Sequence, residues 1–230
     1  MKLRIQFSKH GAMKFIGHLD TMRFFQKAFR RSGIDISYST GFSPHQIMAF
    51  AAPLGVGLES ESEYLDIEAG SVTSTEDMVT KLNNAMSEGF KIIDIRLLPD
   101  NAGNAMASVQ GASYSVAFRE DRRPTFDLHD AIDLFNKREE VVVTKQTKKS
   151  EIELDIKPSV YELTTDGLTV YMKVDASSAG NIKPDLVMNA IYSFYNEAIP
   201  ANALMITRLE TYGRDNDGNL IPLIDFGTKI

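Results

Sequence analysis

The 230-residue chain contains no cysteine and no tryptophan. Without cysteine it cannot form disulfides, hold an iron–sulfur cluster on its own thiolates, or use a thiolate as a nucleophile. Any chemistry of that kind would have to be supplied by another chain. We therefore expect a protein that carries no cofactor.

Long apolar runs are also missing. No stretch approaches the roughly 18 consecutive apolar residues that a membrane-spanning helix needs. The N-terminus alternates apolar and polar residues and shows no apolar signal-peptide core. Hydrophobic residues make up 43% of the chain and charged residues 24%, which is typical of globular proteins. We expect a cytoplasmic protein with no membrane contact.

Positive charge is scarce outside the N-terminal region. The net charge is −6, but residues 1–50 hold eight Lys/Arg and only two acids, a net charge of +6. The other 180 residues therefore carry −12. An anionic partner would be attracted to the first 50 residues and repelled elsewhere, so the asymmetry predicts an oriented anion-binding surface.

Hydrophobic periodicity in residues 1–100 predicts four strands and two helices. The predicted strands span 2–8, 62–70 and 90–99, together with a strand interrupted by a loop, whose two parts are 34–39 and 47–54. The predicted helices span 19–33 and 74–89. Ser74 is the expected N-cap of the second helix, and Gly33 and Gly89 are the expected stops. The order strand, helix, strand, strand, helix, strand is that of a ferredoxin-like α/β sandwich.

The second half repeats this order with additions. A small, polar linker is expected at 101–112, followed by a strand at 113–119, a helix at 125–139, hairpins at 140–156 and 159–175, a helix at 183–197 and a strand at 203–215. The first hairpin should have a solvated basic tip near 144–150, and Asp166-Gly167 is a strong turn signal in the second. The sequence thus predicts an α+β protein with two ferredoxin-like modules, 1–100 and 113–230, each an antiparallel sheet with helices on one face.

The first predicted helix has one basic face. Arg23, Lys27, Arg30 and Arg31 fall at i, i+4, i+7 and i+8, while Leu19, Met22, Phe25, Ala28 and Phe29 form the opposite, apolar stripe. Such a face is often simply solvated. The clustering also suits phosphate binding, since arginine forms paired hydrogen bonds to phosphate and lysine adds a point charge.

Three of the four histidines lie in the same region: His10, His18 and His45. His18 and Asp20 begin the basic helix, where they could act as boundary and first-turn residues or as an acid/base pair. His45 follows Gly41-Phe42-Ser43-Pro44 in a loop and could support the turn or face a ligand. A metal site is not expected, because no pair of these residues has i, i+4 spacing on a helix.

The segment "YSTGFSPHQIMAF" contains Tyr38 and Phe42, whose rings could stack on bases of single-stranded RNA. Gly41 would allow a close backbone approach. The acidic segment that follows, from Glu59 to Glu68, is expected either as the solvated face of an outer strand or as a partner for the helix arginines. The predicted substrate-binding residues are Lys9, Lys14, His18, Arg23, Lys27, Arg30, Arg31, Tyr38, Gly41, Phe42, Ser43 and His45, with His18, Asp20 and His45 as catalytic candidates.

Residues 3–68 closely resemble the radical-SAM-linked domain of unknown function. The resemblance rests on Lys9-x-Gly11, Phe15, His18-Leu19-Asp20, Arg23, Arg30-Arg31, Tyr38-Ser39, the 41–45 motif Gly-Phe-Ser-Pro-His, and Glu63-Tyr64-Leu65-Asp66. That domain often has proline and a basic residue after the histidine, whereas Gln46-Ile47 stand here. The resemblance implies an accessory or substrate-recognition protein for a radical SAM partner in trans.

Three functions remain open from the sequence. The first is a non-catalytic module that binds an anionic substrate, RNA above all, through the basic N-terminal surface. The second is a metal-independent RNA-processing enzyme that uses His18 or His45. The third is a protein–protein adaptor whose basic face contacts an acidic surface of the partner.

Overall fold

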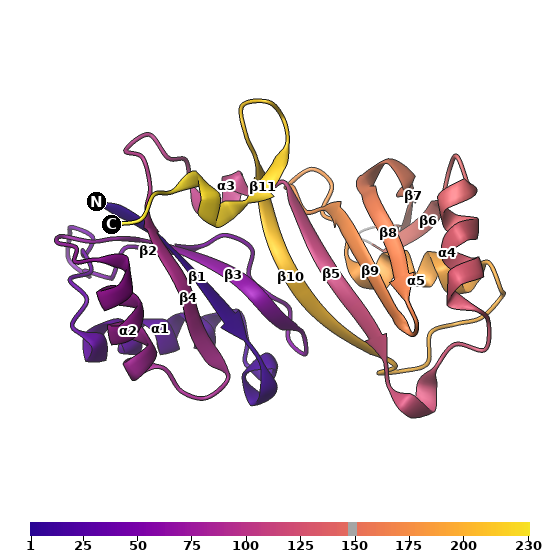
Figure 1. Ribbon diagram of the computed structural model, residues 1–230, viewed down its shortest axis with the longest axis horizontal. Coiled ribbons are helices and arrows are strands. Elements are labelled where there is room, and N and C mark those ends of the chain that lie inside the picture. The colour runs from indigo at the N-terminus through magenta and orange to yellow at the C-terminus, as the bar shows by residue number, and fades with distance from the viewer. Residues whose placement is uncertain (147–150) are drawn as a thin grey trace. The chain divides into compact units, whose positions relative to one another are not determined.

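The computed structural model describes residues 1–146 and 151–230, with only the backbone of residues 145 and 146. The chain divides into two compact units, which we describe separately: Met1–Gln110 with Glu210–Ile230, and Gly111–Leu209. Both are antiparallel sheets with helices, as the α+β prediction requires (Figure 1). In the described part of the chain, no helix has the length and apolar character needed to cross a membrane.

The first unit has the strand and helix order predicted from the sequence. Its elements are β1 (Lys2–Lys9), η1 (Gly11–Phe15), α1 (His18–Ser32), β2 (Met48–Phe50), β3 (Glu59–Glu68), α2 (Thr75–Ala85), β4 (Phe90–Leu97), α3 (Ala105–Ser108), part of β10 (Leu204–Arg214), β11 (Leu220–Pro222) and η4 (Leu223–Phe226). The sheet order is β4-β1-β3, and both β2 and β10 pair with β3. The predicted strand at 34–39 is reduced to isolated bridges at Ile36 and Tyr38.

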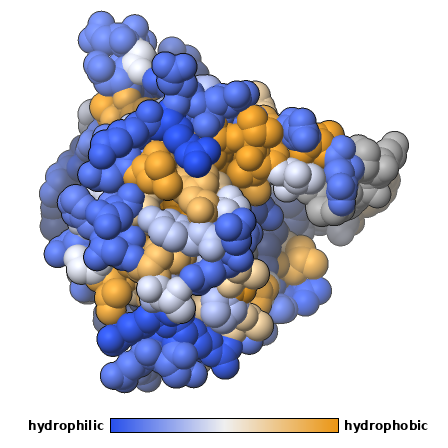
Figure 2. Space-filling view, turned by 90° about the vertical axis from the view of Figure 1, so that its right-hand side faces the viewer, coloured by the Kyte–Doolittle hydropathy of each residue, from blue (hydrophilic) through white to orange (hydrophobic). Residues whose placement is uncertain are grey.

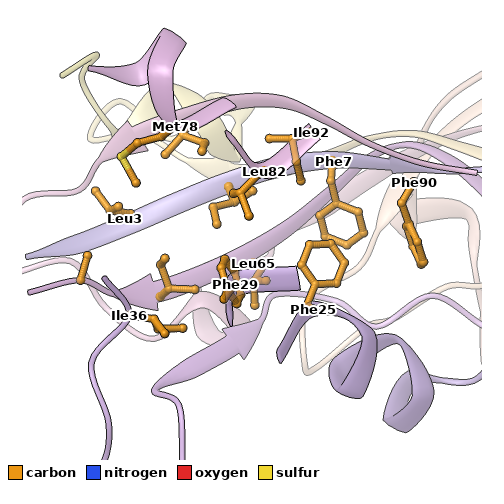
Figure 3. Close-up of a cluster of buried hydrophobic side chains, with 14 of the residues drawn as sticks. Leu3, Phe7, Phe25, Phe29, Ile36, Leu65, Met78, Leu82, Phe90 and Ile92 are labelled. Atoms are coloured by element: carbon orange, nitrogen blue, oxygen red, sulfur yellow. The ribbon is translucent and has the colours of Figure 1, made fainter. Parts of the chain in front are cut away.

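The core of this unit lies between the sheet and the two long helices. Leu3, Ile5 and Phe7 alternate along β1 and point to one face, where they meet Phe25 and Phe29 of α1. Phe7 and Phe25 have ring centroids 4.7 Å apart. Figure 3 shows these rings with Met78 and Leu82 of α2 and Phe90 of β4. This packing orients α1 so that its basic face points away from the core.

The other face of the same sheet is polar and is covered by the C-terminal residues. Arg4 lies opposite Asp66 in the β1–β3 register, and both side chains are buried. Arg4 Nη1 donates to the carbonyl of Leu223, and a bridge joins Leu97 to Thr228. Residues 210–230, which the sequence pattern places in the second module, belong through these contacts to the first unit.

The predicted linker at 101–112 is also structured. Asn104 caps α3 by accepting a hydrogen bond from the backbone N–H of Met106, and Ala105 and Val109 are buried. β5 begins at Gly111. A four-residue helix is too short to show a hydrophobic period, which is why the sequence pattern indicates only a linker there.

The second unit is an enlarged version of the same arrangement. Its elements are β5 (Gly111–Phe118), η2 (Glu120–Arg122), α4 (Leu128–Lys137), β6 (Val142–Gln146), β7 (Glu151–Asp155), η3 (Lys157–Ser159), β8 (Val160–Asp166), β9 (Thr169–Asp175), α5 (Pro184–Ser193) and the first half of β10. The sheet order β10-β5-β9-β8 matches the ferredoxin-like pattern, with the β6–β7 hairpin inserted. Gly167 has φ +57° in the predicted turn. The predicted basic tip at 144–150 lies outside the described residues apart from its first positions.

The surface of the second unit offers no single large apolar area in the view of Figure 2, where apolar patches alternate with hydrophilic side chains. Its exposed apolar residues include Leu134, Val142 and Ile152, at 37%, 50% and 44% exposure. Apolar residues scattered in this way are normal for a protein surface.

Candidate functional site

Helix α1 presents the predicted basic face. Its buried side carries Phe25, Ala28 and Phe29, and it ends at Gly33, whose φ of +70° is the left-handed conformation of a C-cap. Arg23, Lys27, Arg30 and Arg31 are all exposed. Leu19, which the periodicity places on the apolar stripe, is 60% exposed, so the stripe that packs on the core begins at Met22.

Asp20 lies in the first turn of α1, beside Arg23. The Asp20 Oδ1 and Arg23 Nη1 atoms are 3.4 Å apart, and both side chains are about two-thirds exposed, at 63% and 67%. An ion pair this exposed contributes little to stability, roughly 0.2–1 kcal/mol. Arg23 thus remains accessible to a ligand from solvent.

The loop from Ser39 to His45 is closed by hydrogen bonds between its two ends. The Ser39 N–H donates to the His45 carbonyl at 2.8 Å, and the His45 N–H donates to Ser39 Oγ at 3.1 Å. His45 Nδ1 lies 2.8 Å from the same hydroxyl. Gly41 has φ +111°, which favours glycine at the tip. Phe42 beside it is fully exposed, and Tyr38 is 50% exposed.

Gln46 attaches this loop to the basic helix. Its side chain is buried, and Nε2 donates to the Gln26 carbonyl of α1 at 3.3 Å and to the Tyr38 hydroxyl at 3.4 Å. Gln46 is one of the two positions at which the sequence departs from the resemblance described above. The structure makes Gln46 an internal anchor that holds the loop against α1.

A second feature is a narrow pocket beside the start of α1. It is lined by Lys9, His18, Thr21 and Glu63 together with Phe7, Phe50, Pro53 and Leu54. Its free volume is about 10 Å³, close to what one water molecule requires. The His18 ring stands edge-on to Phe50, with ring centroids 5.2 Å apart.

Lys9 forms the floor of this pocket and is not part of the exposed basic surface. The side chain is 3% exposed, and Nζ donates to the Ile16 carbonyl at 3.0 Å. Burial lowers the pKa of the Lys9 ammonium, and the carboxylate of Glu63 opposes that shift. The alternation of Leu3, Ile5 and Phe7 continues to Lys9, so the sequence already held the signal for an inward side chain.

Lys14 is also engaged within the protein. Its Nζ lies 3.0 Å from Glu59 Oε1, and His10 Nδ1 lies 3.5 Å from Glu59 Oε2. His10 Nε2 lies 3.3 Å from Glu61 Oε2. The hydrogen bond from Lys14 is the main reason that the pKa of the Glu59 carboxyl is lowered. Because the Glu59 carboxylate already pairs with Lys14, this lysine is a weaker binding site for phosphate than an unpaired cation would be.

Both sequence interpretations of the acidic strand need correction. β3 is an inner strand, and Glu63 and Asp66 are 4% and 3% exposed. Their neighbours are Lys9 and Arg4 rather than the arginines of α1. Sequence alternation could not show this, because it reveals neither the strands that flank β3 nor the cations that the fold brings to its acids.

The candidate residues thus form two groups. In the first group, Gln46 joins α1, with its exposed cations, to the loop that exposes Tyr38, Phe42 and His45. In the second group, Lys9 and His18 line the narrow pocket. His10, His18 and His45 contact different partners and do not form one site. Within the described residues, no group of three or more His, Asp or Glu side chains could hold a metal ion.

Comparison with known proteins identifies the fold and the family. A chain from the crystal structure of a Cbf5-Nop10-Gar1 complex aligns with a TM-score of 0.51 and 8% sequence identity. The alignment covers 93% of the present chain and 50% of that chain, so the likeness concerns the fold alone. No curated protein matches the sequence. The pattern of DUF2344, a family of uncharacterized proteins conserved in bacteria, matches residues 2–184, and the chain belongs to that family.

Proposed function

We propose that this protein is a non-catalytic recognition module that binds an anionic substrate, RNA, on the surface formed by α1 and the 39–45 loop. One observation carries the proposal: α1 exposes Arg23, Lys27 and Arg30, and Gln46 joins this helix to a hydrogen-bonded loop that exposes two aromatic rings. Phosphates would contact Arg23, Lys27 and Arg30, and unpaired bases would stack on Phe42 or Tyr38.

Salt dependence tests the electrostatic part of this proposal. Binding of a fluorescein-labelled single-stranded RNA pool, followed by anisotropy, should weaken with salt. If Arg23, Lys27 and Arg30 each contact a phosphate, log affinity should fall with log salt at a slope of roughly −2.1. Arg30→Ala should reduce the slope by about 0.7. Lys91→Ala is the matched control, because Lys91 is an exposed lysine on β4.

Phe42→Ala tests the stacking part. Each stacked base contributes about 1–3 kcal/mol, so the affinity should fall without a change in the salt slope. Salt-independent binding, or equal affinities for Arg30→Ala and Lys91→Ala, would refute the electrostatic part. An unchanged affinity in Phe42→Ala would refute stacking.

We further propose that the module serves a radical SAM protein in trans. The resemblance of residues 3–68 supports this partner, and a chain without cysteine can supply no thiolates for a radical SAM cluster. Co-purification from the native host, with and without nuclease, tests the association. An association that survives nuclease and is lost in Arg23→Glu/Arg30→Glu would instead favour the adaptor function without RNA.

A catalytic role is the second candidate, and the narrow pocket favours it. His18 there shares a confined space with a buried lysine and a buried glutamate, which suits a proton-transferring histidine in an RNA-processing enzyme. His18→Ala should abolish RNA cleavage and preserve RNA binding. His129→Ala, on an exposed position of α4, is the control. His45→Ala should preserve cleavage, since His45 does not line the pocket. A wild-type protein that cleaves no tested RNA would remove this candidate.

A further inference from the structure

The cleft lined by residues of α1 and α2 is a second candidate ligand site, separate from the 39–45 loop. Its volume is about 630 Å³, within the range of roughly 300–1,000 Å³ found for small-molecule sites. The walls include Phe24, Arg31 and Ser32 from α1 and Lys81, Asn84 and Met86 from α2 and the residue after it. The cleft can therefore hold a ligand of several functional groups.

Two cations on facing walls give the cleft a preference for anions. Arg31 Nη2 donates to the Ala85 carbonyl at 2.7 Å, which holds the guanidinium at the cleft. Within the described residues this is the hydrogen bond that engages Arg31, out of five N–H donors on the group. Lys81 reaches the cleft from the other helix, and its Nζ lies 2.6 Å from Asp77 Oδ2. Among the residues that line the cleft, the charged side chains are Arg31 and Lys81, and both are cations.

The remaining walls suit a flat, partly apolar group. Phe24 is half-buried, stacked on Phe90 with ring centroids 4.8 Å apart, and its ring lies 5.9 Å from the Arg31 guanidinium carbon. Met86 adds an adaptable apolar surface. The exposed Asn84 amide offers both a donor and an acceptor, which is what the edge of a nucleobase requires. A ligand that offers a phosphate to the cations, a planar ring to Phe24 and a hydrogen-bonding edge to Asn84 is a nucleotide.

We infer that the α1–α2 cleft binds a nucleoside monophosphate, with Arg31 and Lys81 on the phosphate and Asn84 beside the base. This inference does not depend on RNA binding by the loop surface. A single nucleotide in the cleft needs neither Phe42 nor His45. Arg31 is the residue that belongs to both the basic face of α1 and the cleft.

Isothermal titration with a nucleoside monophosphate, the matching nucleoside and inorganic phosphate tests the inference. The nucleotide should bind at least about tenfold more tightly than either fragment, because charge-assisted hydrogen bonds and the apolar wall act together. Lys81→Ala and Arg31→Gln should each weaken nucleotide binding about tenfold. Lys27→Ala, on the basic face outside the cleft, should leave it unchanged.

The RNA assay separates this inference from the proposed function. Lys81→Ala should lower nucleotide affinity and leave the RNA salt slope unchanged. Lys27→Ala should reduce the RNA salt slope and leave nucleotide affinity unchanged. Amide chemical shifts of residues 81–87 should move on adding nucleotide, which locates binding even if Arg31→Gln disturbs the helix end. Absence of nucleotide binding at millimolar concentration, or equal affinity for phosphate and nucleotide, would overturn the inference.

Discussion

Replacing Arg4 with methionine should strongly destabilise the first unit. Arg4 Nε and Nη2 each lie 2.8 Å from one oxygen of Asp66, a paired geometry, and the side chains are 2% and 3% exposed. Arg4 Nη1 also donates to the Leu223 carbonyl at 3.0 Å. The substitution leaves the Asp66 carboxylate buried without its cation and removes a hydrogen bond to the C-terminal residues.

The expected cost follows from that unpaired charge. Removing one partner of a buried ion pair costs about 3–5 kcal/mol, whereas a domain is stable by about 5–15 kcal/mol. The double variant Arg4→Met/Asp66→Leu should recover most of the loss, since an apolar pair of similar volume needs no counter-charge. The free energy of unfolding should therefore be far from additive for the two substitutions.

Urea unfolding followed by circular dichroism gives the free energies, and hydrogen exchange of β1 and β3 amides follows the first unit separately from the second. Arg96→Met is the matched control. Arg96 also contacts two acids, Asp94 and Asp225 at 2.9 Å, but it is 24% exposed, so its loss should cost clearly less than the loss of Arg4. Equal costs for Arg4→Met and Arg96→Met would refute the reasoning from burial.

Three further predictions concern the same unit. Burial raises the pKa of the Glu210 carboxyl above its ordinary 4.5, although Tyr64 and Ser62 donate hydrogen bonds to it. Because the folded protein holds the Glu210 proton more tightly than the unfolded chain, this group's contribution to the free energy of unfolding is complete below pH 4.5. That contribution is lost as pH rises through the raised pKa. Glu210→Gln should flatten that decline in urea titrations between about pH 4 and 7, and an unchanged slope would contradict it. Gly89→Ala should cost about 1–3 kcal/mol in urea unfolding, because φ is +93° and the new Cβ would lie 2.7 Å from the His10 carbonyl oxygen, whereas Gly103→Ala, with open space around it, should cost much less. Lys14→Ala should raise the pKa of Glu59 toward its ordinary value in an NMR titration, while an unchanged pKa would mean that the Lys14 hydrogen bond is not its main cause.

The sequence predicted the elements that carry strong periodicity. The amphipathic pattern of α1 and the alternation of Leu3, Ile5 and Phe7 each depend on one buried face, and both appear in the structure. It did not predict α3, the inner position of β3 or the return of residues 210–230 to the first unit. These features depend on contacts between segments distant in sequence, which local periodicity does not report.

The candidate site divides in the same way. The exposure of Arg23, Lys27 and Arg30 follows from helical spacing alone, so the sequence sufficed for them. Whether His10, His18 and His45 converge depends on tertiary contacts, and each has a different neighbour. The cleft containing Lys81 was missed because its two walls come from helices more than 40 residues apart in the chain.

Phe42 distinguishes the loop surface from an ordinary solvated turn. Burying a phenylalanine side chain stabilises a protein by about 1.5–3 kcal/mol, yet Phe42 is fully exposed on a loop whose two ends are joined by hydrogen bonds. A disordered loop could expose the ring by chance, but these hydrogen bonds and the Gln46 anchor restrain the backbone. Because the ring has no packing role within the first unit, its role is best sought in a contact with another molecule. The exposed ring and the exposed cations of α1 are thus the two features behind our proposal that this surface binds an anionic molecule with flat apolar groups.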